Sequence, residues 1–333
     1  MFTLVKRIDR YSLMLLATVL VATVLPCRGE VAAAFRIVTV AAIALLFFLH
    51  GAKLSRAAIL AGMANWRLHL VVFALTFLVF PALGIGFRAM GEWVVSPALA
   101  SGMLFLALLP STVQSSIAFT SIARGNVPAA VCSASASNLV GILLTPLLVA
   151  ALMDGAGGGG VSGGEIRTIA LQLLLPFVLG HASRPLTART VERHKAVLSL
   201  VDRGSILLVV YTAFSAAVVE GLWAAVPAWQ LLAVVALCAA MLAIIMVLAR
   251  TVARRLGFST PDEIAILFCG SKKSLASGVP MAGVLFPAAQ VGAIILPLMI
   301  FHQLQLLAFA AIAQRYARRA PDADAARNAV LAS

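Results

Sequence analysis

Ten apolar segments separated by short polar connections occupy most of the 333-residue chain. Each is close to the roughly 20 residues that an α-helix needs to cross the hydrocarbon core of a bilayer. Hydrophobic residues make up 62% of the sequence and charged residues only 11%, which leaves too little polar surface to cover a water-soluble globule. We therefore predict an all-α integral membrane protein with ten transmembrane helices, embedded in the lipid bilayer.

The predicted spans are bounded by charged residues or by Gly and Pro residues. They cover residues 11–26, 34–50, 68–87, 97–123, 126–153, 166–183, 204–222, 228–250, 262–286 and 288–314. With the N-terminus in the cytoplasm, only four basic residues fall in or beside the outer connections, Arg28, Arg36, Arg88 and Arg167. The positive-inside rule thus predicts that both termini are cytoplasmic. It also accounts for the net charge of +13, so we expect no nucleic-acid partner.

The first segment has some features of a secretory signal, because Lys6, Arg7 and Arg10 precede about fifteen apolar residues. No clean small-x-small cleavage motif follows in residues 26–30, so we expect this helix to be retained. The composition is rich in alanine, and in arginine relative to lysine. This balance favours a bacterial protein, and we therefore expect a multi-pass protein of the bacterial plasma membrane.

A Gly-rich stretch at residues 155–164 lies near the middle of the chain. It lacks the Gly-Lys-Ser/Thr ending of a phosphate-binding loop, so we expect a flexible linker. Five predicted spans lie on each side of it, and because five is odd, the second half must enter the membrane from the opposite side. This is the topology of the inverted repeats found in many secondary transporters. We predict a first five-helix repeat at 1–154, a second at 165–318 and a cytoplasmic tail at 319–333.

Polar residues interrupt the fourth and the ninth predicted spans near the bilayer midplane. The residues involved are Pro110, Ser111, Thr112, Gln114, Ser115 and Ser116 in the fourth span, and Gly270, Ser271, Lys272, Lys273 and Ser274 in the ninth. Non-helical backbone at this depth is tolerated only where protein encloses it or where it lines a wet cavity. A matched pair of interruptions, one in each half, therefore predicts a substrate or ion site. The alternative is that Pro110 only kinks one helix and that the small residues only allow close packing.

The two adjacent lysines are the most informative residues, since a cation at the midplane costs about 2.5 to 3.5 kcal/mol to insert. Lys272 and Lys273 lie about ten residues from either end of the span, too far for their amines to reach the interface easily. No Asp or Glu lies deep in any predicted span to pair with them. Either a carboxylate or sulfonate of a substrate pairs with the lysines, or one of them has lost its proton.

Polar residues in two further spans allow two readings. Ser133 and Ser137 are four residues apart on one helix face, and Asn138 follows them. They either pack helices closely or line the site beside the interruptions. In the tenth span, His302, Gln303 and Gln305 either line the site or form interhelical hydrogen bonds, and we favour the hydrogen bonds.

Five segments resemble the bile acid:sodium symporter family, and specifically its bacterial, SBF-like branch. They are Phe-Leu-His-Gly at 48–51, Ala-Arg-Gly-Asn-Val at 123–127, the segment 132–138, Leu-Thr-Pro-Leu at 144–147 and the long, specific segment 268–278. The resemblance implies two inverted five-helix repeats, with a core domain in which the unwound fourth and ninth helices cross and a panel domain that moves against it. It also implies transport of amphipathic organic anions by alternating access, in several members coupled to sodium.

The chain departs from the sodium-coupled members at the ninth span. Those members carry a glutamate two residues before the glycine that matches Gly270, and glutamine and asparagine shortly after it. This chain has Phe268, Lys272 and Lys273 at those positions, and an ammonium among the ligands repels a sodium ion. Part of a sodium site could survive only at Ser115, Ser116 and Ser133. We therefore expect one lysine ammonium to take the place of the sodium charge, with transport either uncoupled or linked to protons.

Secondary transport of an organic anion is the predicted function, with no enzyme activity and no cofactor; the coupling ion, if any, is sodium or a proton. Two other classes remain open. One is a membrane receptor or regulator that binds a ligand without moving it, and the other is a membrane-embedded hydrolase in which Ser271 or Ser274 uses a lysine as base. The sequence contains no P-loop, HExxH, GxSxG or CxxC motif, so ATP-driven transport, a zinc site and a disulfide framework are not indicated.

Overall fold

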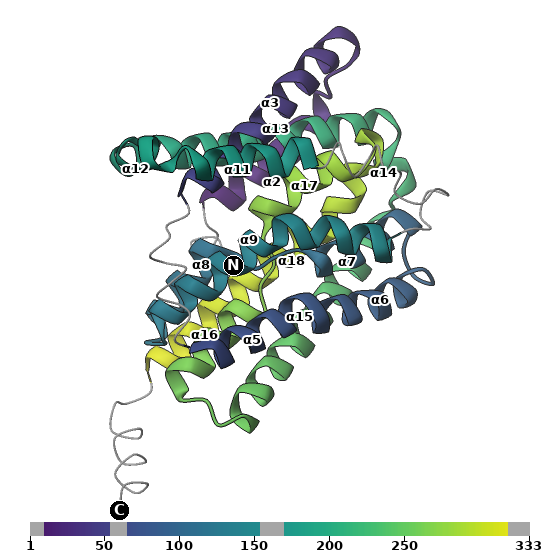
Figure 1. Ribbon diagram of the computed structural model, residues 1–333. Helices are drawn as coiled ribbons and strands as arrows, with labels where there is room; N and C mark the ends of the chain where they lie inside the picture. Colours follow the sequence, from purple (N-terminus) through teal and green to yellow (C-terminus); the bar gives the residue numbers. More distant parts are fainter. Residues whose placement is uncertain (1–9, 54–64, 154–169, 319–333) are drawn as a thin grey trace, which may run out of the picture.

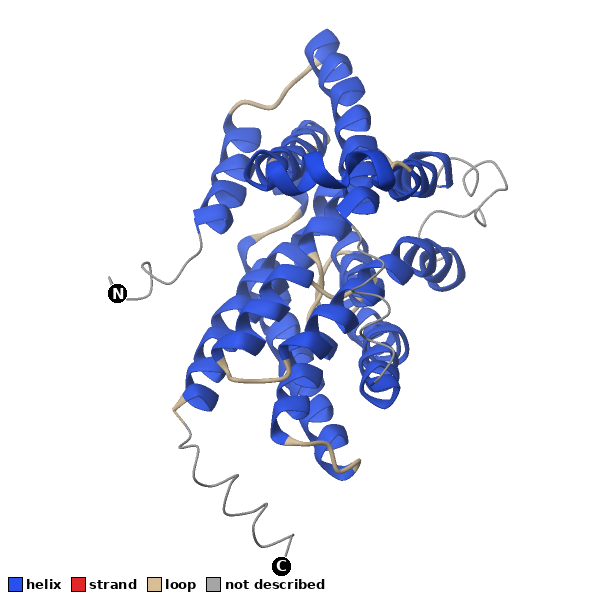
Figure 2. Ribbon diagram, turned by 60° about the vertical axis from the view of Figure 1, so that its left-hand side comes forward, coloured by secondary structure: helices blue, strands red, loops and turns tan. Residues whose placement is uncertain are grey.

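The computed structural model describes residues 10–53, 65–153 and 170–318 (Figure 1). Every regular element within these ranges is helical, and no strand occurs among them (Figure 2). The prediction of an all-α fold is therefore confirmed for the described part of the chain. The predicted linker at 155–164 and the predicted tail at 319–333 lie outside the described residues.

The helices follow one another with short connections. In chain order they are α2 (Arg10–Val24), α3 (Gly29–Lys53), α5 (Trp66–Ala74), η2 (Leu75–Val79), α6 (Phe80–Gly91), α7 (Pro97–Leu108), α8 (Val113–Ile122), α9 (Val127–Leu152), η3 (Ala170–Leu174), α11 (Leu175–Ala182), α12 (Arg184–Arg193), α13 (Lys195–Val219), α14 (Leu222–Ala225), α15 (Ala228–Arg255), α16 (Thr260–Gly270), α17 (Leu275–Leu285) and α18 (Ala288–Ala317). The elements η2 and η3 are single π-helical turns that continue into the α-helix after them.

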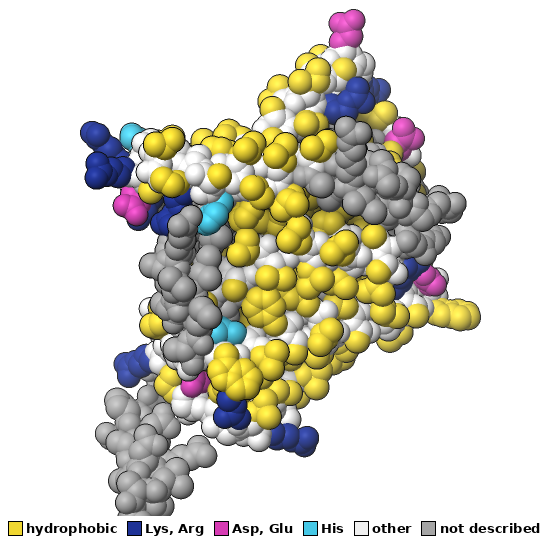
Figure 3. Space-filling model, viewed as in Figure 1, with side chains coloured by type: hydrophobic (Ala, Val, Ile, Leu, Met, Phe, Trp, Pro, Cys, Tyr) yellow, Lys and Arg dark blue, Asp and Glu magenta, His cyan; other side chains and the backbone are white. Residues whose placement is uncertain are grey.

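Six helices among the described residues are long and apolar enough to cross a membrane. They are Gly29–Lys53, Trp66–Gly91, Val127–Leu152, Lys195–Val219, Ala228–Arg255 and Ala288–Ala317. The pair α7 and α8, bent by 64° at a short break, makes a seventh span if it is counted as one. The chain is thus a multi-pass membrane protein, and ten spans remain a prediction. Apolar side chains form a wide band on the visible face, with charged side chains at its margins (Figure 3), as lipid surroundings require.

The helices are arranged in two layers (Figures 1 and 2). Helices α2, α3, α11, α12 and α13 contact one another in the first layer, and the second layer contains the broken helices α7 with α8 and α16 with α17. Helix α7 is the most enclosed element, since every residue from Leu99 to Leu108 is buried. A helix that is apolar all round suits such a place, because it has no polar face to turn toward water.

Helix α13 begins earlier than the apolar pattern predicts. The seventh predicted span begins at residue 204, whereas the helix begins at Lys195. The pattern marks the apolar part only, and the helix continues through polar residues beyond it. Helix α12 was not predicted either, because it is polar and short.

The first turn of α16 is fixed by a buried carboxylate. Glu263 is 5% exposed and accepts hydrogen bonds from Arg250 Nε (3.2 Å), Arg254 Nε (2.9 Å) and the Tyr316 hydroxyl (2.7 Å). These partners come from α15 and α18, so three helices meet at this carboxylate. The network holds the end of α16 that lies opposite its break.

Candidate functional site

The fourth and ninth predicted spans are broken where the sequence predicts interruptions, and the two breaks contact each other. Residues 109–112 separate α7 from α8, and residues 271–274 separate α16 from α17. Four hydrogen bonds join them: Ser111 Oγ donates to the Cys269 carbonyl (2.6 Å), the Ser274 N–H to the Pro110 carbonyl (2.9 Å), Thr112 Oγ1 to the Lys273 carbonyl (2.9 Å) and Ser116 Oγ to the Phe268 carbonyl (3.0 Å). Side chains thus satisfy backbone carbonyls that the breaks leave free.

Local sequence explains both breaks. Leu109 precedes a proline and takes the extended backbone that such residues prefer, with ψ at 156°. In the second break, Ser274 caps α17, because its hydroxyl accepts a hydrogen bond from the Ser277 N–H at 3.1 Å. Each break therefore combines a residue that ends or begins a half-helix with polar side chains that form hydrogen bonds to unpaired backbone groups.

The Lys273 amine is held by backbone carbonyls. Its nitrogen donates to the carbonyls of Thr76 (3.0 Å), Ala107 (2.7 Å) and Leu109 (2.6 Å), which uses all three donors of an ammonium. It also lies 4.0 Å from the centre of the Phe80 ring, a favourable cation–π distance. We name this arrangement the carbonyl cage; it consists of the three carbonyls around Lys273 Nζ.

Two helix irregularities form the carbonyl cage. Ala107 and Leu109 stand at the C-terminal end of α7, where carbonyls lack intrahelical donors and the helix dipole is negative. Thr76 belongs to the π-helical turn η2. Such turns are rare in proteins, but many of them occur at functional sites. Sequence reasoning did not predict these acceptors of the Lys273 amine, because every residue has a backbone carbonyl and the residue type does not show which one is unpaired.

Lys272 has different surroundings. Its side chain is fully buried, and its nitrogen lies 4.2 Å from the centre of the Phe119 ring and 5.2 Å from that of Phe309. The nitrogen makes no hydrogen bond to any residue in the described part of the chain. The two neighbouring lysines therefore differ: one amine has a full set of acceptors, and the other faces aromatic rings.

Gln305 of α18 supports the backbone of the second break. Its side-chain oxygen accepts from the Lys273 N–H (3.1 Å), and its amide nitrogen donates to the Lys273 carbonyl (3.0 Å). The same nitrogen lies 2.9 Å from His302 Nδ1. The expected interhelical hydrogen bonding is thus confirmed for Gln305, which bonds across helices to both main-chain groups of one residue.

We expect Gln305→Ala to lower the free energy of unfolding by about 2 to 4 kcal/mol, because two buried backbone groups lose their partner. Gln303→Ala is the matched control, since this side chain lies on the same helix and is only half-buried. Unfolding by SDS titration in mixed micelles measures both. Equal losses in the two variants would contradict the role assigned to Gln305.

The remaining predicted residues lie around the breaks, and some of their side chains already form hydrogen bonds within the protein. Ser137 Oγ accepts from the Ser111 N–H (3.1 Å), and Asn138 accepts from the Ser277 hydroxyl (2.7 Å), so α9 contacts the first break and the first turn of α17. Gly270 packs against Leu75, because an added Cβ there would lie 2.7 Å from Leu75 Cδ1. The Ser271 hydroxyl is buried without a partner among the described residues.

The three serines considered for a sodium site are not equivalent. Ser133 Oγ lies 2.6 Å from His69 Nδ1, and Ser116 Oγ is bonded to the Phe268 carbonyl. Of the three, only Ser115 has a hydroxyl oxygen that is buried and has no hydrogen-bond partner within the described ranges. No group of three or more His, Cys, Asp or Glu side chains there is placed to hold a metal ion.

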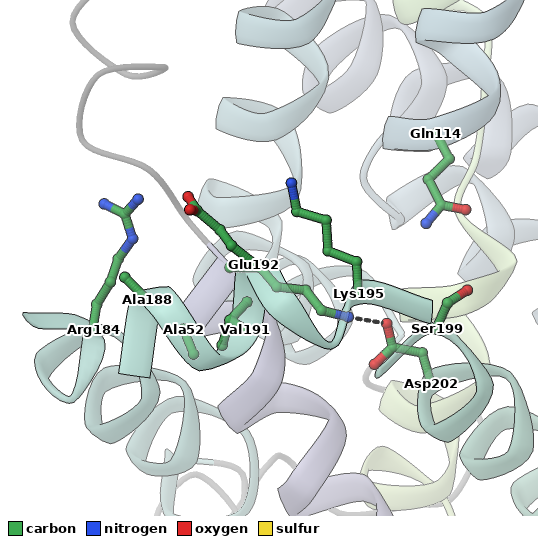
Figure 4. A pocket seen from close by; sticks show the side chains of 10 residues that line it. Ala52, Gln114, Arg184, Ala188, Val191, Glu192, Lys195, Ser199 and Asp202 are labelled. Carbon is green, nitrogen blue, oxygen red and sulfur yellow. Dashed lines mark hydrogen bonds and ion pairs between the residues drawn. The ribbon is translucent and has the colours of Figure 1, made fainter. Parts of the chain in front are cut away.

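A cavity of about 420 Å³ lies between the two layers. Figure 4 shows Gln114 reaching toward it from α8 on one side, and Arg184, Glu192 and Lys195 from α12 and α13 on the other. Lys53 of α3 and Asp202 of α13 also line it and form an ion pair with each other. Gln114 is the one predicted site residue among those lining the cavity, which we name the interlayer cavity.

A multi-pass helical protein with two broken helices in contact has the architecture of a membrane transporter. The chain belongs to the SBF-like CPA transporter family, whose model matches residues 9–318. It is 59% identical to uncharacterized protein PA2026 of Pseudomonas aeruginosa, over 96% of both chains. It is 54% identical to "Putative symporter YfeH" of Escherichia coli, over 95% of both chains.

More distant relatives carry a more specific name. The chain is 26% identical to sodium/bile acid cotransporter 7 of Mus musculus, over 80% of this chain and 79% of the relative. It is similarly 26% identical to the protein of that name from Danio rerio, over 81% of each. The resemblance to the bile acid:sodium symporter family is thereby confirmed, and the chain is a symporter-like member of a transporter family.

Proposed function

We propose that the chain is a secondary transporter that moves a small organic anion across the bacterial plasma membrane by alternating access. Membership of a transporter family and the two broken helices in contact support this proposal. Ten transmembrane helices form two inverted repeats, at 1–154 and 165–318, joined by the linker at 155–164 and followed by the tail at 319–333. Both termini are cytoplasmic. The layer with the broken helices is the core domain, and the other layer is the panel domain that moves against it.

The carbonyl cage is the observation that carries the second part of the proposal, which is that transport does not require sodium. Oxygen atoms, backbone carbonyls included, are the ligands that hard cations prefer. In this protein the Lys273 nitrogen already lies among three of them, one acceptor for each proton of an ammonium. A sodium ion close to that ammonium would be repelled, most strongly where water is excluded. The fixed charge of Lys273 thus takes the place of the ion.

Lys272 is the proposed coupling residue, because its nitrogen lacks acceptors and can exist without a proton at less cost than Lys273. The ionisable groups around it are Lys273, the next residue in the chain, Cys269 of α16 and His302 of α18. Helix α8 presents the ring of Phe119 to it and contains no ionisable residue. A proton that binds and leaves Lys272 during each cycle would link anion transport to the proton gradient.

The arrangement of the break disfavours the hydrolase alternative. A serine nucleophile needs a base within hydrogen-bond reach, and the Lys273 amine is turned to three carbonyls instead. The Ser274 hydroxyl is bonded to Ser277 at 3.0 Å. The Ser271 hydroxyl and the Lys272 amine have no hydrogen-bond partner among the described residues, so they do not form a nucleophile–base pair with each other. The receptor alternative makes the same contacts as a transporter, so only a measurement of transport separates the two.

Uptake of radiolabelled organic anions into proteoliposomes, with taurocholate and gluconate in the panel, tests the proposal. We expect uptake to be equal when external sodium is replaced by choline and to respond to an imposed pH gradient. In Lys272→Met we expect the response to the pH gradient to be lost. An anion that raises the melting temperature of the purified protein but never enters the vesicles would instead establish a receptor. Uptake that requires sodium would contradict the role of Lys273.

A further inference from the structure

Most of the residues that line the interlayer cavity carry a charged or polar group. Seven of its ten lining residues are polar or charged, and the other three are Ala52, Ala188 and Val191. No aromatic side chain from the described residues lines it. A steroid nucleus or another large apolar body needs apolar and aromatic walls to be held. Such a body meets no aromatic wall among the described residues of this cavity.

The charges of the cavity leave a net positive site. Lys53 and Asp202 neutralise each other in an ion pair. The charged residues left are Arg184, Lys195 and Glu192, which together carry one net positive charge. Arginine and lysine bind carboxylates through charge-assisted hydrogen bonds, and the carboxylate of Glu192 accepts hydrogen bonds from hydroxyl groups.

Gln114 is the residue of α8 that lines the cavity, and it lies two residues after the first break. This residue stands in the first turn of α8, directly after the break, and its side chain is exposed to the cavity. The N-cap residue Thr112 does not cap α8 with its side chain, because its hydroxyl is bonded to the Lys273 carbonyl. The first turn of α8 thus has no side-chain cap from Thr112, and its N–H groups and the positive end of the helix dipole favour an anion.

We infer that the substrate is a compact carboxylate bearing hydroxyl groups, whose carboxylate binds Arg184 and Lys195 and whose hydroxyl groups donate to Glu192. This inference rests on the proposed transport function and narrows its substrate class away from steroid anions. Arg184 and Lys195 are thus specificity-determining residues of the panel layer. Gln114 connects the bound carboxylate to the broken helix, so that occupancy of the cavity bears on the motion of the core.

The melting temperature of the purified full chain in sodium-free choline buffer tests this inference. The probes are glycerate and gluconate, which are compact hydroxylated carboxylates. The controls are hexanoate, a carboxylate without hydroxyl groups, and taurocholate, a sulfonate on a large steroid body. We expect glycerate or gluconate to raise the melting temperature and the other two to leave it unchanged, because only a ligand that binds the folded state stabilises it.

Variants of the lining residues test whether the stabilising carboxylate binds in the interlayer cavity. Arg184→Gln and Lys195→Gln are each expected to raise the Kd about tenfold, which corresponds to about 1.4 kcal/mol. Arg189→Gln is the matched control, because this residue lies on the same helix as Arg184, is exposed and does not line the cavity. Lys195 is exposed, so its variant keeps the fold even if Arg184→Gln lowers stability.

Three results would overturn the inference: stabilisation by hexanoate or taurocholate alone, no stabilisation by either hydroxylated carboxylate, or equal weakening in Arg189→Gln. None of them would disprove transport, because uptake of taurocholate into proteoliposomes would still establish it. Conversely, binding of gluconate without uptake of any anion would support the proposed binding site and contradict the proposed transport function.

Discussion

Lys273→Met is expected to lower the free energy of unfolding by about 3 to 5 kcal/mol, because it leaves three carbonyls without a donor. The nitrogen of Lys273 contacts the carbonyls of Thr76, Ala107 and Leu109 at 2.6 to 3.0 Å. The three residues that supply these carbonyls are fully buried, so an acceptor left without a donor there is costly. SDS titration in mixed micelles measures the loss, and transport by the variant is expected to fall with it.

Lys272→Met provides the matched control one residue away. The Lys272 nitrogen has no hydrogen bond to lose within the described residues, and a methionine sulfur packs well against aromatic rings such as Phe119 and Phe309. We expect this variant to be at least as stable as the wild-type protein while its transport no longer depends on pH. Equal destabilisation by the two substitutions would contradict the different roles of the lysines, as would normal transport with unchanged pH dependence in both.

The second large effect is expected where α3 and α11 cross. A Cβ added at Gly180 would lie 1.9 Å from the Phe48 carbonyl oxygen, and one at Gly51 would lie 2.0 Å from the Phe177 carbonyl oxygen. Both obstacles are backbone atoms, so the helices must separate to admit a methyl group. We expect Gly180→Ala and Gly51→Ala each to cost about 3 kcal/mol or more of stability, at the upper end of overpacking effects.

Two other helical glycines supply controls for this prediction. A Cβ at Gly86 or at Gly204 would meet no atom within 4 Å. Alanine there is expected to change stability little, or to raise it by up to about 1 kcal/mol through helix propensity. The same SDS titration compares the four variants. A tolerated Gly180→Ala would show that the two helices are less closely packed than the structure has them.

Much of the scaffold could be predicted from the sequence, because lipid restricts a spanning chain to helices whose apolar length is visible in the pattern. Pro110 marked the first break, and the polar run from Gly270 to Ser274 marked the second. Helix ends were predicted less well: α13 extends nine residues before the predicted start at 204, because a helix can continue past the apolar stretch.

The chemistry inside the breaks could be predicted only in part. The sequence indicated that Lys272 and Lys273 are unusual, but not which amine has partners, since those partners are the carbonyls of a π-helical turn and of the end of α7. The interlayer cavity was also missed. Its charged residues Arg184 and Glu192 belong to the polar helix α12, which was not predicted, and Lys195 begins α13 nine residues before the predicted span.

Sodium dependence of stability is the most direct test of a fixed ammonium in place of the coupling ion. The melting temperature of the purified protein would be measured while sodium chloride replaces choline chloride at constant ionic strength, with and without a stabilising anion. We expect no change in either series, because the Lys273 ammonium occupies the carbonyl cage. A rise in melting temperature with sodium alone, or stabilisation by the anion only when sodium is present, would show that a sodium site exists and would contradict sodium-independent transport.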